Sequence, residues 1–492
     1  MTFLKTTTSK IGWNFDNSYL NLPSTLMIKS TPEKLIEPSI IKLNESLAAD
    51  LNLNFDSIDK KKQSLIFSGN LLPQGSDCIS QAYAGHQFGF FTMLGDGRAL
   101  LLGEHINKKK QRFDIQLKGS GITPFSRNGD GKATLKSMLR EYLISEAMHF
   151  LNVPTTRSLA VTKTGEKVLR DDFFEGGILT RVASSHIRVG TFQYLATKND
   201  INSLKKLVKY TLERHFIEKT DDNAAINLLN NLMEKQISLI VNWMRVGFIH
   251  GVMNTDNMTL SGETIDYGPC AFMDHYNPNT VFSSIDKQKR YSFVNQEIIC
   301  HWNLSRFAET LIPLIDTNED NAIKIGSEII NSFKEKFNLK WTSMIKSKLG
   351  ILGSMAEDNN LILKIFDWME KNNADYTNTF LKFMDKEKIN DDVYDNLTFK
   401  NLYLEWNNRI KKNKIPKEIS EKTMKSNNPK LIPRNHLVED ALNDAENNNF
   451  IKFNKLIELI KTPYSIDIQK NKHYCSPPDL NFTKNYRTFC GT

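Results

Sequence analysis

A polar loop between two apolar segments, at residues 250–274, constrains this chain more than any other stretch of it. Three small side chains that carry oxygen atoms, Asp256, Asn257 and Asp266, lie within about a dozen residues of one another there. Mg²⁺ takes oxygen ligands and is usually held by one or two carboxylates together with the phosphates of a nucleotide. The loop therefore predicts a magnesium–nucleotide site between buried elements.

The order of residues in this loop resembles the catalytic loop and the metal-binding aspartate of protein kinases. His250 is followed by Asn257 and then by the run Asp266-Tyr267-Gly268. A kinase carries its catalytic base two residues after the histidine, but this chain has Val252 there. The loss of that carboxylate argues against ordinary transfer of a γ-phosphate, whereas Asp256 is compatible with attack elsewhere on the triphosphate.

Two features upstream predict the phosphate-binding part of such a site. The run Gly95-Asp96-Gly97-Arg98 leads into an apolar, strand-like segment, and glycine lets a backbone approach phosphates because it has no Cβ. A hairpin turn without a ligand is the alternative interpretation. Residues 113–118 alternate apolar and polar side chains, which predicts a strand, and they end on Lys118. In kinases a lysine at the end of such a strand holds the nucleotide phosphates.

A loop and a helix are predicted next. Residues 119–131 are rich in glycine, serine and polar side chains, and they form either a flap that contacts the ligand or a disordered linker. Residues 134–150 have apolar side chains on one side, which predicts a helix. Glu141 falls toward another side, where it can pair with Lys118 and fix the ammonium group for phosphate oxygens. The alternative is a solvent-exposed couple of Arg140 and Glu141.

Two arginines could add positive charge to the same site. Arg181 and Arg188 lie seven residues apart, where a strand predicted to begin at residue 176 gives way to a loop. The planar guanidinium group suits phosphate, and both side chains could reach one polyanion. Ordinary surface arginines are the alternative.

The predicted fold class is α+β, and the chain divides into four parts. Residues 1–65 are expected to form an N-terminal extension with a helix at 39–51, and residues 66–195 a β-rich lobe. Residues 196–412 are expected to form a helical lobe, followed by a C-terminal helical extension and tail at 413–492. The further predictions are helices at 224–246, 293–314, 321–349 and 437–460, and a linker or exposed loop at 411–428.

The composition excludes several classes of protein. The chain has 492 residues, 40% hydrophobic and 24% charged, as is ordinary for soluble enzymes. No apolar run has the length of a membrane helix, and the N-terminus lacks a secretion signal. We therefore expect a cytoplasmic protein without a membrane partner. The net charge is +8, but the lysines are scattered and no basic–aromatic stripe appears, so we expect no nucleic-acid partner.

Five cysteines are too few and too dispersed for a disulfide scaffold. Cys490, two residues from the C-terminus, is expected to be mobile, and it is either redox-active or an ordinary thiol. The sequence leaves open whether it pairs with Cys270, Cys300 or Cys475.

Taken together, these motifs identify a family that the chain resembles, the selenoprotein O family. The stretches that carry the resemblance are residues 83–89, 94–104, 114–127, 139–149, 181–190 and 250–268, with weaker support from 428–436 and 489–492. The resemblance implies a protein kinase-like bilobal fold with a β-rich N-lobe and a helical C-lobe. It also implies a protein adenylyltransferase, which transfers AMP from ATP to Ser, Thr or Tyr hydroxyls of protein substrates and releases pyrophosphate. The nucleotide of the family lies in the kinase cleft in an inverted orientation.

The resemblance also implies roles for individual residues. Asp256 would be the proton acceptor, and Asn257 and Asp266 would hold Mg²⁺, with Mn²⁺ as the alternative ion. The residues implied to contact ATP, with Glu141 as the partner of Lys118, are Gly95, Gly97, Arg98, Lys118, Asp130, Gly131, Arg181, Arg188 and Asp266. The protein is expected to act as a monomer. Two other functions remain as alternatives: a protein kinase that transfers the γ-phosphate, which Val252 argues against, and a catalytically silent ATP-binding scaffold.

Overall fold

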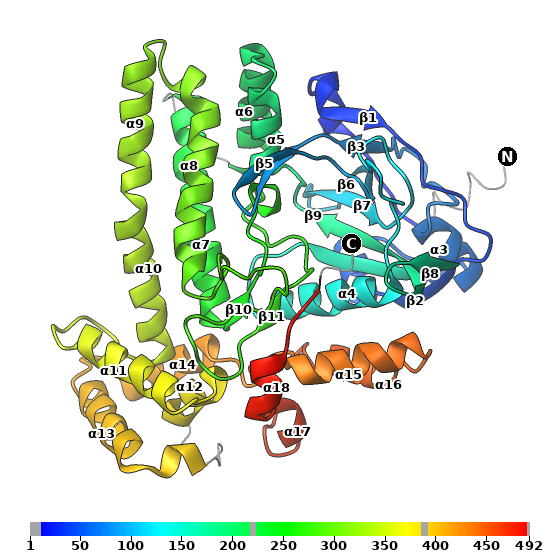
Figure 1. The fold of residues 1–492 in the computed structure, drawn as a ribbon. Helices are drawn as coiled ribbons and strands as arrows, with labels where there is room; N and C mark the ends of the chain where they lie inside the picture. Colours follow the sequence, from blue (N-terminus) through cyan, green and yellow to red (C-terminus); the bar gives the residue numbers. More distant parts are fainter. Residues whose placement is uncertain (1–10, 217–222, 385–391, 490–492) are drawn as a thin grey trace.

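A seven-stranded antiparallel sheet occupies one side of the molecule, and helices build most of the rest (Figure 1). The computed structural model describes residues 11–216, 223–384 and 392–489. The strands lie in the order β1-β3-β6-β7-β9-β8-β2, and the α+β class predicted from the sequence is confirmed. The strands of this sheet are β1 Met27–Lys29, β2 Ser39–Leu43, β3 Ile79–Gln81, β6 Ala99–Ile106, β7 Arg112–Lys118, β8 Arg157–Leu169 and β9 Phe173–Ala183.

The register of the central strands brings Lys118 and Arg181 to one face of the sheet. In the pairing of β7 with β9, Lys118 lies opposite Leu179 and Gln116 lies opposite Arg181. Paired residues share a face, and so do residues two apart on a strand. The two cationic side chains therefore emerge on the same side of the sheet. The strand predicted at residues 113–118 is confirmed.

Helix α4 (Leu135–Phe150) packs against this sheet at β8 and β9. Thr134 caps its N-terminus by accepting a hydrogen bond from the Ser137 amide. Apolar side chains recur every three or four residues and are buried, which is the pattern that predicted the helix. The prediction is confirmed, and the helix carries Glu141 toward Lys118.

The N-terminal segment supplies both edge strands of the sheet, since β1 pairs with β3 and β2 pairs with β8. The helix predicted at residues 39–51 is therefore wrong in its first half, which forms β2. Only Glu45–Asp50 is helical, as α2. Asn44 separates the two elements, because its side chain caps the helix. The β-branched pair Ile40-Ile41 favours the strand before it.

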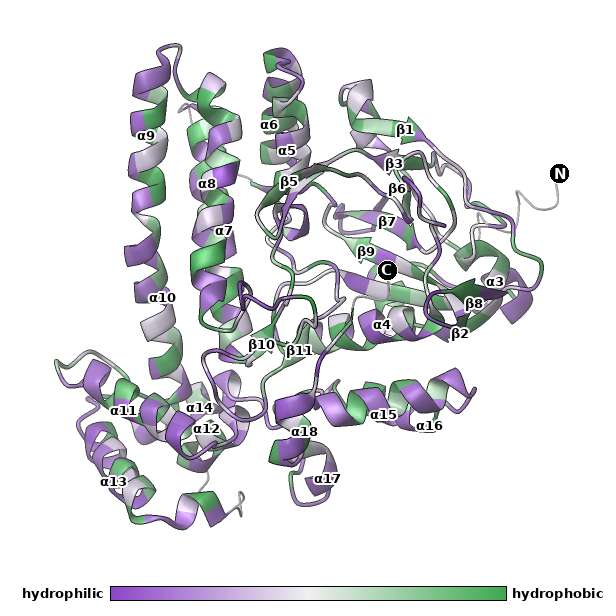
Figure 2. Ribbon diagram, in the orientation of Figure 1, coloured by the Kyte–Doolittle hydropathy of each residue, from purple (hydrophilic) through white to green (hydrophobic). Residues whose placement is uncertain are grey.

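The helices that follow lie beside and below the sheet in Figure 1. In Figure 2 green and purple alternate along many of them, as in helices that bury one side. None of the helices in the described part of the chain is both long and apolar enough to cross a membrane. Their bounds are α3 Lys60–Phe67, α5 Val189–Ala196, α6 Ile201–His215, α7 Ala224–Arg245, α8 Asn295–Ile315, α9 Glu319–Asn331, α10 Phe333–Lys348, α11 Asp358–Lys371, α12 Tyr376–Met384, α13 Leu397–Lys411, α14 Lys417–Asn427, α15 Asn435–Glu446, α16 Ile451–Leu459, α17 Lys472–Cys475 and α18 Leu480–Asn485.

Two predictions in the helical half are wrong in detail. The helix expected at residues 321–349 is interrupted at Ser332, whose hydroxyl donates to the carbonyl of Ile329 between α9 and α10. The stretch at 411–428, expected as a linker or exposed loop, contains helix α14. Its Met424 is buried, and the helix packs against α10. The sequence of this segment is largely polar, and its one apolar contact face was too small to predict the helix.

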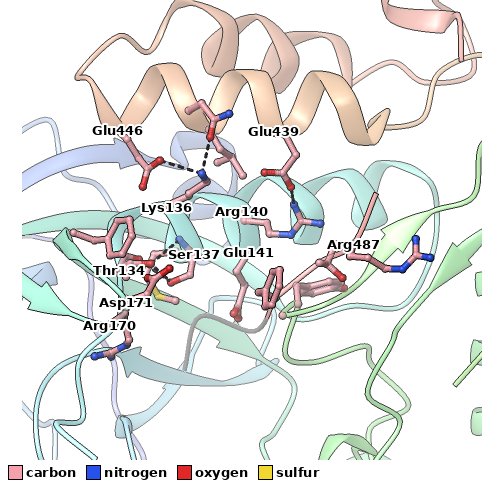
Figure 3. A pocket seen from close by; sticks show the side chains of 18 of the residues that line it. Thr134, Lys136, Ser137, Arg140, Glu141, Arg170, Asp171, Glu439, Glu446 and Arg487 are labelled. Carbon is pink, nitrogen blue, oxygen red and sulfur yellow. Dashed lines mark hydrogen bonds and ion pairs between the residues drawn. The ribbon is translucent and has the colours of Figure 1, made fainter. Parts of the chain in front are cut away.

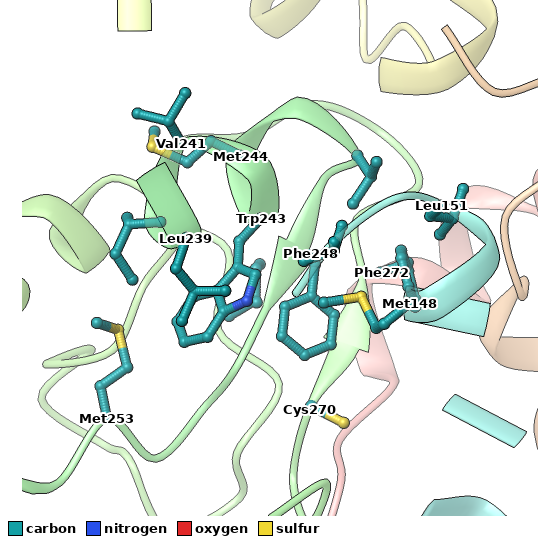
Figure 4. Close-up of a cluster of buried hydrophobic side chains, with 14 of the residues drawn as sticks. Met148, Leu151, Leu239, Val241, Trp243, Met244, Phe248, Met253, Cys270 and Phe272 are labelled. Atoms are coloured by element: carbon teal, nitrogen blue, oxygen red, sulfur yellow. The ribbon is translucent and has the colours of Figure 1, made fainter. Parts of the chain in front are cut away.

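A short ladder anchors both ends of the polar loop in the core. Strand β10 (Phe248–Ile249) pairs with β11 (Ala271–Phe272), and the rings of Phe248 and Phe272 pack 5.3 Å apart between centroids (Figure 4). The indole of Trp243, on α7, stacks on His250 at 5.2 Å. Buried aromatic packing thus fixes where the loop begins and ends.

A buried network of ion pairs ties the C-terminal helices to the rest of the molecule. Arg434, next to α15, is only 1% exposed and bonds Asp274 at 2.8 Å and Asp375 at 2.6 Å. It also donates to the carbonyl of Cys475 at 2.9 Å. Asp274, the last residue of the polar stretch found in the sequence, therefore has a structural partner.

We predict that Arg434→Ala destabilises the protein by about 3–5 kcal/mol, because it leaves two buried carboxylates without their cation. Urea unfolding should show this as a lower midpoint. Lys452→Ala is the matched control, since its ion pairs with Asp440 and Asp444 are exposed and such pairs contribute little. Equal midpoints for the two variants would contradict the prediction.

Candidate active site

The predicted site residues gather around one cavity of about 430 Å³. It lies where the β-rich half meets the polar loop of the helical half. Glu141 is the single predicted site residue that does not line it, and Glu141 contacts Lys118 from behind. The predicted residues that line the cavity are Gly95, Gly97, Arg98, Lys118, Asp130, Gly131, Arg181, Arg188, Asp256, Asn257 and Asp266.

Four charged side chains form a group that we call the charge cluster: Lys118, Arg181 and Asp266, which line the cavity, and Glu141, which lies behind Lys118. The Lys118 ammonium lies 2.7 Å from Glu141 and 2.6 Å from Asp266. Arg181 donates to Glu141 at 2.9 Å through Nε and to Asp266 at 2.7 Å through Nη2. The predicted Lys118–Glu141 contact is confirmed. The alternative of an exposed Arg140–Glu141 couple is wrong, because both residues are buried.

The cluster keeps both carboxylates ionised. Burial raises the pKa of Glu141, but Arg181 and Lys118 more than offset it, and the net shift is downward. Burial opposes ionisation of Asp266 as well, yet Lys118, Arg181 and Arg188 hold its pKa well below the usual range. Asp266 also has a φ of 63°, which is rare outside glycine and is typical of functional sites.

Arg188 adds a third cation, at the start of α5. The structure rules out the alternative of a surface position for it and for Arg181, because they are 2% and 1% exposed. The guanidinium of Arg188 lies over the ring of Tyr83, 4.2 Å from the centroid, and donates to the backbone carbonyl of Asp256 at 3.2 Å. Tyr83 therefore belongs to the site, although its place in a motif had predicted no role for it.

Asp96 is a further residue that sequence reasoning missed. It lies between the two glycines, and its buried carboxylate accepts a hydrogen bond from the Gln81 amide at 3.0 Å. Its other oxygen, Oδ1, is 3.7 Å from Arg188. Burial raises the pKa of Asp96 to about 6, against the opposing effect of Arg188. The sequence signal that could have identified Asp96 is its position as an acidic residue between the two glycines of a Gly-x-Gly turn.

The loop at residues 119–131 folds onto the glycine turn. Thr123 donates to the carbonyl of Asp96 at 2.6 Å, and Ser126 donates to that of Gly97. Gly95 has a φ of 133°, and a Cβ there would lie 2.4 Å from the ring of Phe125. The glycine is thus required for this contact. The loop is an ordered cover over the turn rather than a disordered linker, while its contact with a ligand stays a prediction.

Arg170, which the sequence did not single out, holds the end of this loop. Its guanidinium bonds Asp130 at 2.8 Å and the carbonyl of Lys132 at 2.9 Å, and it lines the cavity. Arg170 and Lys132 lower the pKa of Asp130, with the hydrogen bond from Arg170 as the largest cause.

The polar loop presents Asp256 to the cavity and keeps His250 out of it. His250 donates through Nε2 to the carbonyl of Ile265 at 2.9 Å and accepts from the Val252 amide at Nδ1, so one neutral tautomer is fixed. Burial lowers its pKa. Its role is to join the two ends of the loop.

Asp256 has the properties of a proton acceptor near neutral pH. Burial raises its pKa to about 6, although Arg188 opposes the shift. Its Oδ1 is buried and has no hydrogen-bond partner among the described residues. Such an orphaned acceptor is costly for stability, which points to a functional reason for it.

The donor set fits a magnesium ion that arrives with a nucleotide. Asn257 uses its amide nitrogen to bond the carbonyl of Val252 at 2.9 Å, which leaves its amide oxygen as a possible ligand. Asp266 lines the same cavity. In the described part of the chain, no group of three or more His, Cys, Asp and Glu could bind a metal unaided. The remaining ligands would therefore be phosphate oxygens, as is usual for Mg²⁺.

A second cavity, of about 510 Å³, lies on the other side of the Lys118–Glu141 pair, between α4, α15 and the tail (Figure 3). Lys136 bonds Glu446 at 3.0 Å across it, and Arg140 bonds Glu439 at 2.8 Å. Of the cysteines, Cys78, Cys270, Cys300 and Cys475 are buried. Cys490 lies outside the described residues, so its mobility, its redox role and its pairing stay predictions.

Comparison with known proteins matches residues 10–461 to one protein family, described as "Protein adenylyltransferase SelO". The chain belongs to this family. The resemblance seen in the motifs is therefore confirmed over nearly the whole chain. The β-rich half with its lysine strand, helix α4 and the loop between the halves form the kinase-like bilobal arrangement that the family implies.

Relatives cover the chain almost end to end. One from Pelagibacter ubique (strain HTCC1062) is 55% identical over 98% of this chain and 100% of its own length. One from Bacillus thuringiensis (strain Al Hakam) is 50% identical over 99% of this chain and 100% of its own. Both are named "Protein nucleotidyltransferase YdiU". Among solved structures, ROP2 from Toxoplasma gondii, a virulence factor with a protein-kinase fold and no enzymatic activity, covers 67% of this chain and 86% of its own, at 10% identity and a TM-score of 0.25. At this identity and TM-score, the match supports no conclusion about this chain.

We predict that Lys118→Ala lowers the affinity for ATP by about 10- to 10²-fold, because it removes a charge-assisted contact to the phosphates worth about 1.5–3 kcal/mol. The fold should survive, since Arg181 still pairs with both carboxylates. Isothermal titration with ATP and Mg²⁺ measures the effect, and Lys167→Ala, on the exposed side of β8, is the control. Unchanged affinity would rule out a role for Lys118 in ATP binding.

We predict that Asp256 titrates near pH 6 in metal-free protein. Its pKa is raised, so the carboxyl is protonated below about pH 6 and gains its charge above it. Difference infrared spectroscopy between about pH 5 and pH 7 should show a carboxyl band that Asp256→Asn removes. Asp96 titrates in the same range, so Asp96→Asn should remove a different band. A spectrum that Asp256→Asn leaves unchanged would contradict the assignment.

Proposed function

We propose that this protein is a protein adenylyltransferase that moves AMP from ATP to a Ser, Thr or Tyr hydroxyl of a protein substrate. One observation carries the proposal: a single cavity holds three buried cations, Lys118, Arg181 and Arg188, beside the carboxylate of Asp256. At the position of the kinase base, the same cavity is lined by the apolar Val252. The described residues thus offer a base and a polyanion site, but not the carboxylate that γ-phosphoryl transfer uses.

In the proposed reaction the hydroxyl oxygen of the acceptor attacks the α-phosphorus of ATP. A new bond forms between that oxygen and the α-phosphorus, and the bond from the α-phosphorus to the oxygen bridging to the β-phosphorus breaks. The hydroxyl proton passes to the Asp256 carboxylate, and pyrophosphate leaves with the electron pair.

The cation-rich base of the cavity suits this leaving group. Pyrophosphate gains charge as the bond breaks, and Lys118, Arg181 and Arg188 are fixed by their contacts before the reaction starts. Donors held in place in a water-poor site stabilise developing charge more than solvent does. Mg²⁺, held by Asn257 and Asp266 with the phosphates, would neutralise further charge on the triphosphate.

Several expectations stay attached to this proposal. ATP contact by Gly95, Gly97, Arg98, Asp130 and Gly131 is supported by their place around the cavity. The preference for Mg²⁺ over Mn²⁺, the inverted orientation of ATP, the monomeric state and the cytoplasmic location remain predictions from the sequence and the family, as do the four domain boundaries.

The proposal is tested by incubating the protein with Mg²⁺, a generic acceptor such as casein, and ATP labelled at the α- or the γ-phosphate. We expect label on protein from the α-phosphate alone. Asp266→Ala should abolish metal-dependent nucleotide binding. Asp256→Ala should slow transfer by about 10²–10⁴-fold and leave ATP binding intact. Asp367→Ala, an exposed acid on α11, is the control.

Each other outcome identifies an alternative. Label from the γ-phosphate alone would make the protein a kinase despite Val252. ATP binding without transfer of either label would favour the silent scaffold. Full activity of Asp256→Ala would leave adenylyl transfer in place but show that another group accepts the proton.

A further inference from the structure

A two-stranded ribbon beside the cavity exposes apolar side chains to solvent. Strand β4 (Ala84–Gln87) pairs with β5 (Phe90–Met93), and together they form a sheet separate from the large one. Phe90 is 78% exposed, Phe91 45% and Met93 42%. Isolated apolar residues are common on protein surfaces, but a group of large ones on a single strand is typical of an interaction site.

The other strand of the ribbon is fixed against the proposed base. A Cβ at Gly85 would lie 2.1 Å from Oδ1 of Asp256, so only glycine allows this approach. The His86 amide donates to Thr255 at 2.8 Å, and the Phe88 amide donates to Asn254 at 3.1 Å. Strand β4 thus holds the ribbon to the loop that carries Asp256, while strand β5 lies on the side of the ribbon away from that loop.

A basic loop borders the tip of the ribbon. The run Ile285-Asp286-Lys287-Gln288-Lys289-Arg290 carries three cations: Lys287 and Lys289 are exposed, and the Arg290 guanidinium lies 4.8 Å from the centroid of the Trp302 ring. Asp286 is buried, and its carboxylate is used by the backbone amides of Arg290 and Tyr291. The loop therefore presents positive charge.

The ribbon and the basic loop meet at the mouth of the cavity. The Arg290 guanidinium comes within 3.7 Å of where a Cβ of Gly89 would be, and the rings of Phe88 and Tyr291 lie 5.1 Å apart. Phe88 and Ile285 line the cavity itself, and Ile285 is 63% exposed. One surface thus combines apolar side chains with positive charge, and it is continuous with the opening through which an acceptor hydroxyl must enter.

We propose that this surface docks the protein substrate, and that it selects a segment in which apolar and acidic residues flank the acceptor hydroxyl. The inference rests on the proposed adenylyl transfer. The apolar flank covers Phe91 and Met93, which lie two residues apart and share one face of β5, and the acidic flank faces Lys287 and Lys289. The outer edge of β5 also offers backbone groups to an extended segment, a common mode of peptide recognition. Charge complementarity sets which segments are accepted.

The test compares three acceptor peptides that share one central serine. The first has phenylalanine on one side and glutamates on the other, the second replaces the glutamates with lysines, and the third replaces the phenylalanine with glycine. Transfer from α-labelled ATP gives kcat/KM for each peptide. We expect the first peptide to exceed each of the others by about tenfold, mainly through KM, as for uniform binding energy.

Two double variants carry the test to the protein. Phe91→Ser with Met93→Ser should lower kcat/KM for the first peptide about tenfold and remove its advantage over the third. Lys287→Glu with Lys289→Glu should reverse the preference between the first and second peptides. Affinity for ATP should stay at the wild-type value in both, since these side chains do not line the cavity.

Matched controls lie far from the mouth. Leu339→Ser, 66% exposed on α10, controls for the loss of exposed apolar surface. Lys60→Glu with Lys61→Glu, at the start of α3, controls for the change of net charge. Both should behave as wild type with all three peptides.

The outcomes separate this inference from the proposed function. Wild-type transfer that is equal for the three peptides, or variants that keep the wild-type preference, would overturn the docking surface and leave adenylyl transfer standing. No transfer of α-label to any acceptor would overturn the proposed function, and the docking inference with it.

Discussion

The site depends on a cluster of ion pairs that joins the two halves of the molecule. Lys118 and Arg181 come from adjacent strands, Glu141 from α4, and Asp266 from the loop of the helical half, and each cation bonds both carboxylates. Burying charges is costly, and each carboxylate here is offset by two cations, so it keeps one when the other is removed. The whole cluster forms only when sheet, helix and loop are all in place. A triphosphate that enters must share Lys118 and Arg181 with Glu141 and Asp266, and Arg188 supplies the additional positive charge.

Several features around the cluster cost stability. Asp256 keeps a buried oxygen without a described partner, Asp266 has a left-handed backbone, and Asp96 is buried with a raised pKa. Each of these would be removed if stability alone were selected. They lie together at one cavity, where the acceptor hydroxyl of the proposed reaction would donate to the unpartnered oxygen of Asp256.

Much of this could be predicted from the sequence, because the decisive signals were local. The alternation before Lys118 and the helical spacing around Glu141 each set one element, and both are confirmed. The errors have a different origin. Residues 39–51 contain apolar spacing that suits a helix, but pairing with β8 overrides it in the first half. Helix α14 contacts α10 through few apolar groups, so its sequence resembles that of an exposed loop. Tyr83 and Arg170 were missed because their roles depend on Arg188 and Asp130, which lie far from them in the chain.

Helix α4 links the C-terminal region to the site through contacts on two of its sides. Successive residues of a helix point about 100° apart, so Arg140 and Glu141 face different surroundings. Glu141 joins the charge cluster, while Arg140 bonds Glu439 of α15 at 2.8 Å, the carbonyl of Cys270 at 2.7 Å and the hydroxyl of Tyr486 at 3.3 Å. The orientation of one helix is thus set on one side by the cluster and on the other by the C-terminal extension. This C-terminal segment is part of the scaffold that positions Glu141, and the family match extends into it, to residue 461.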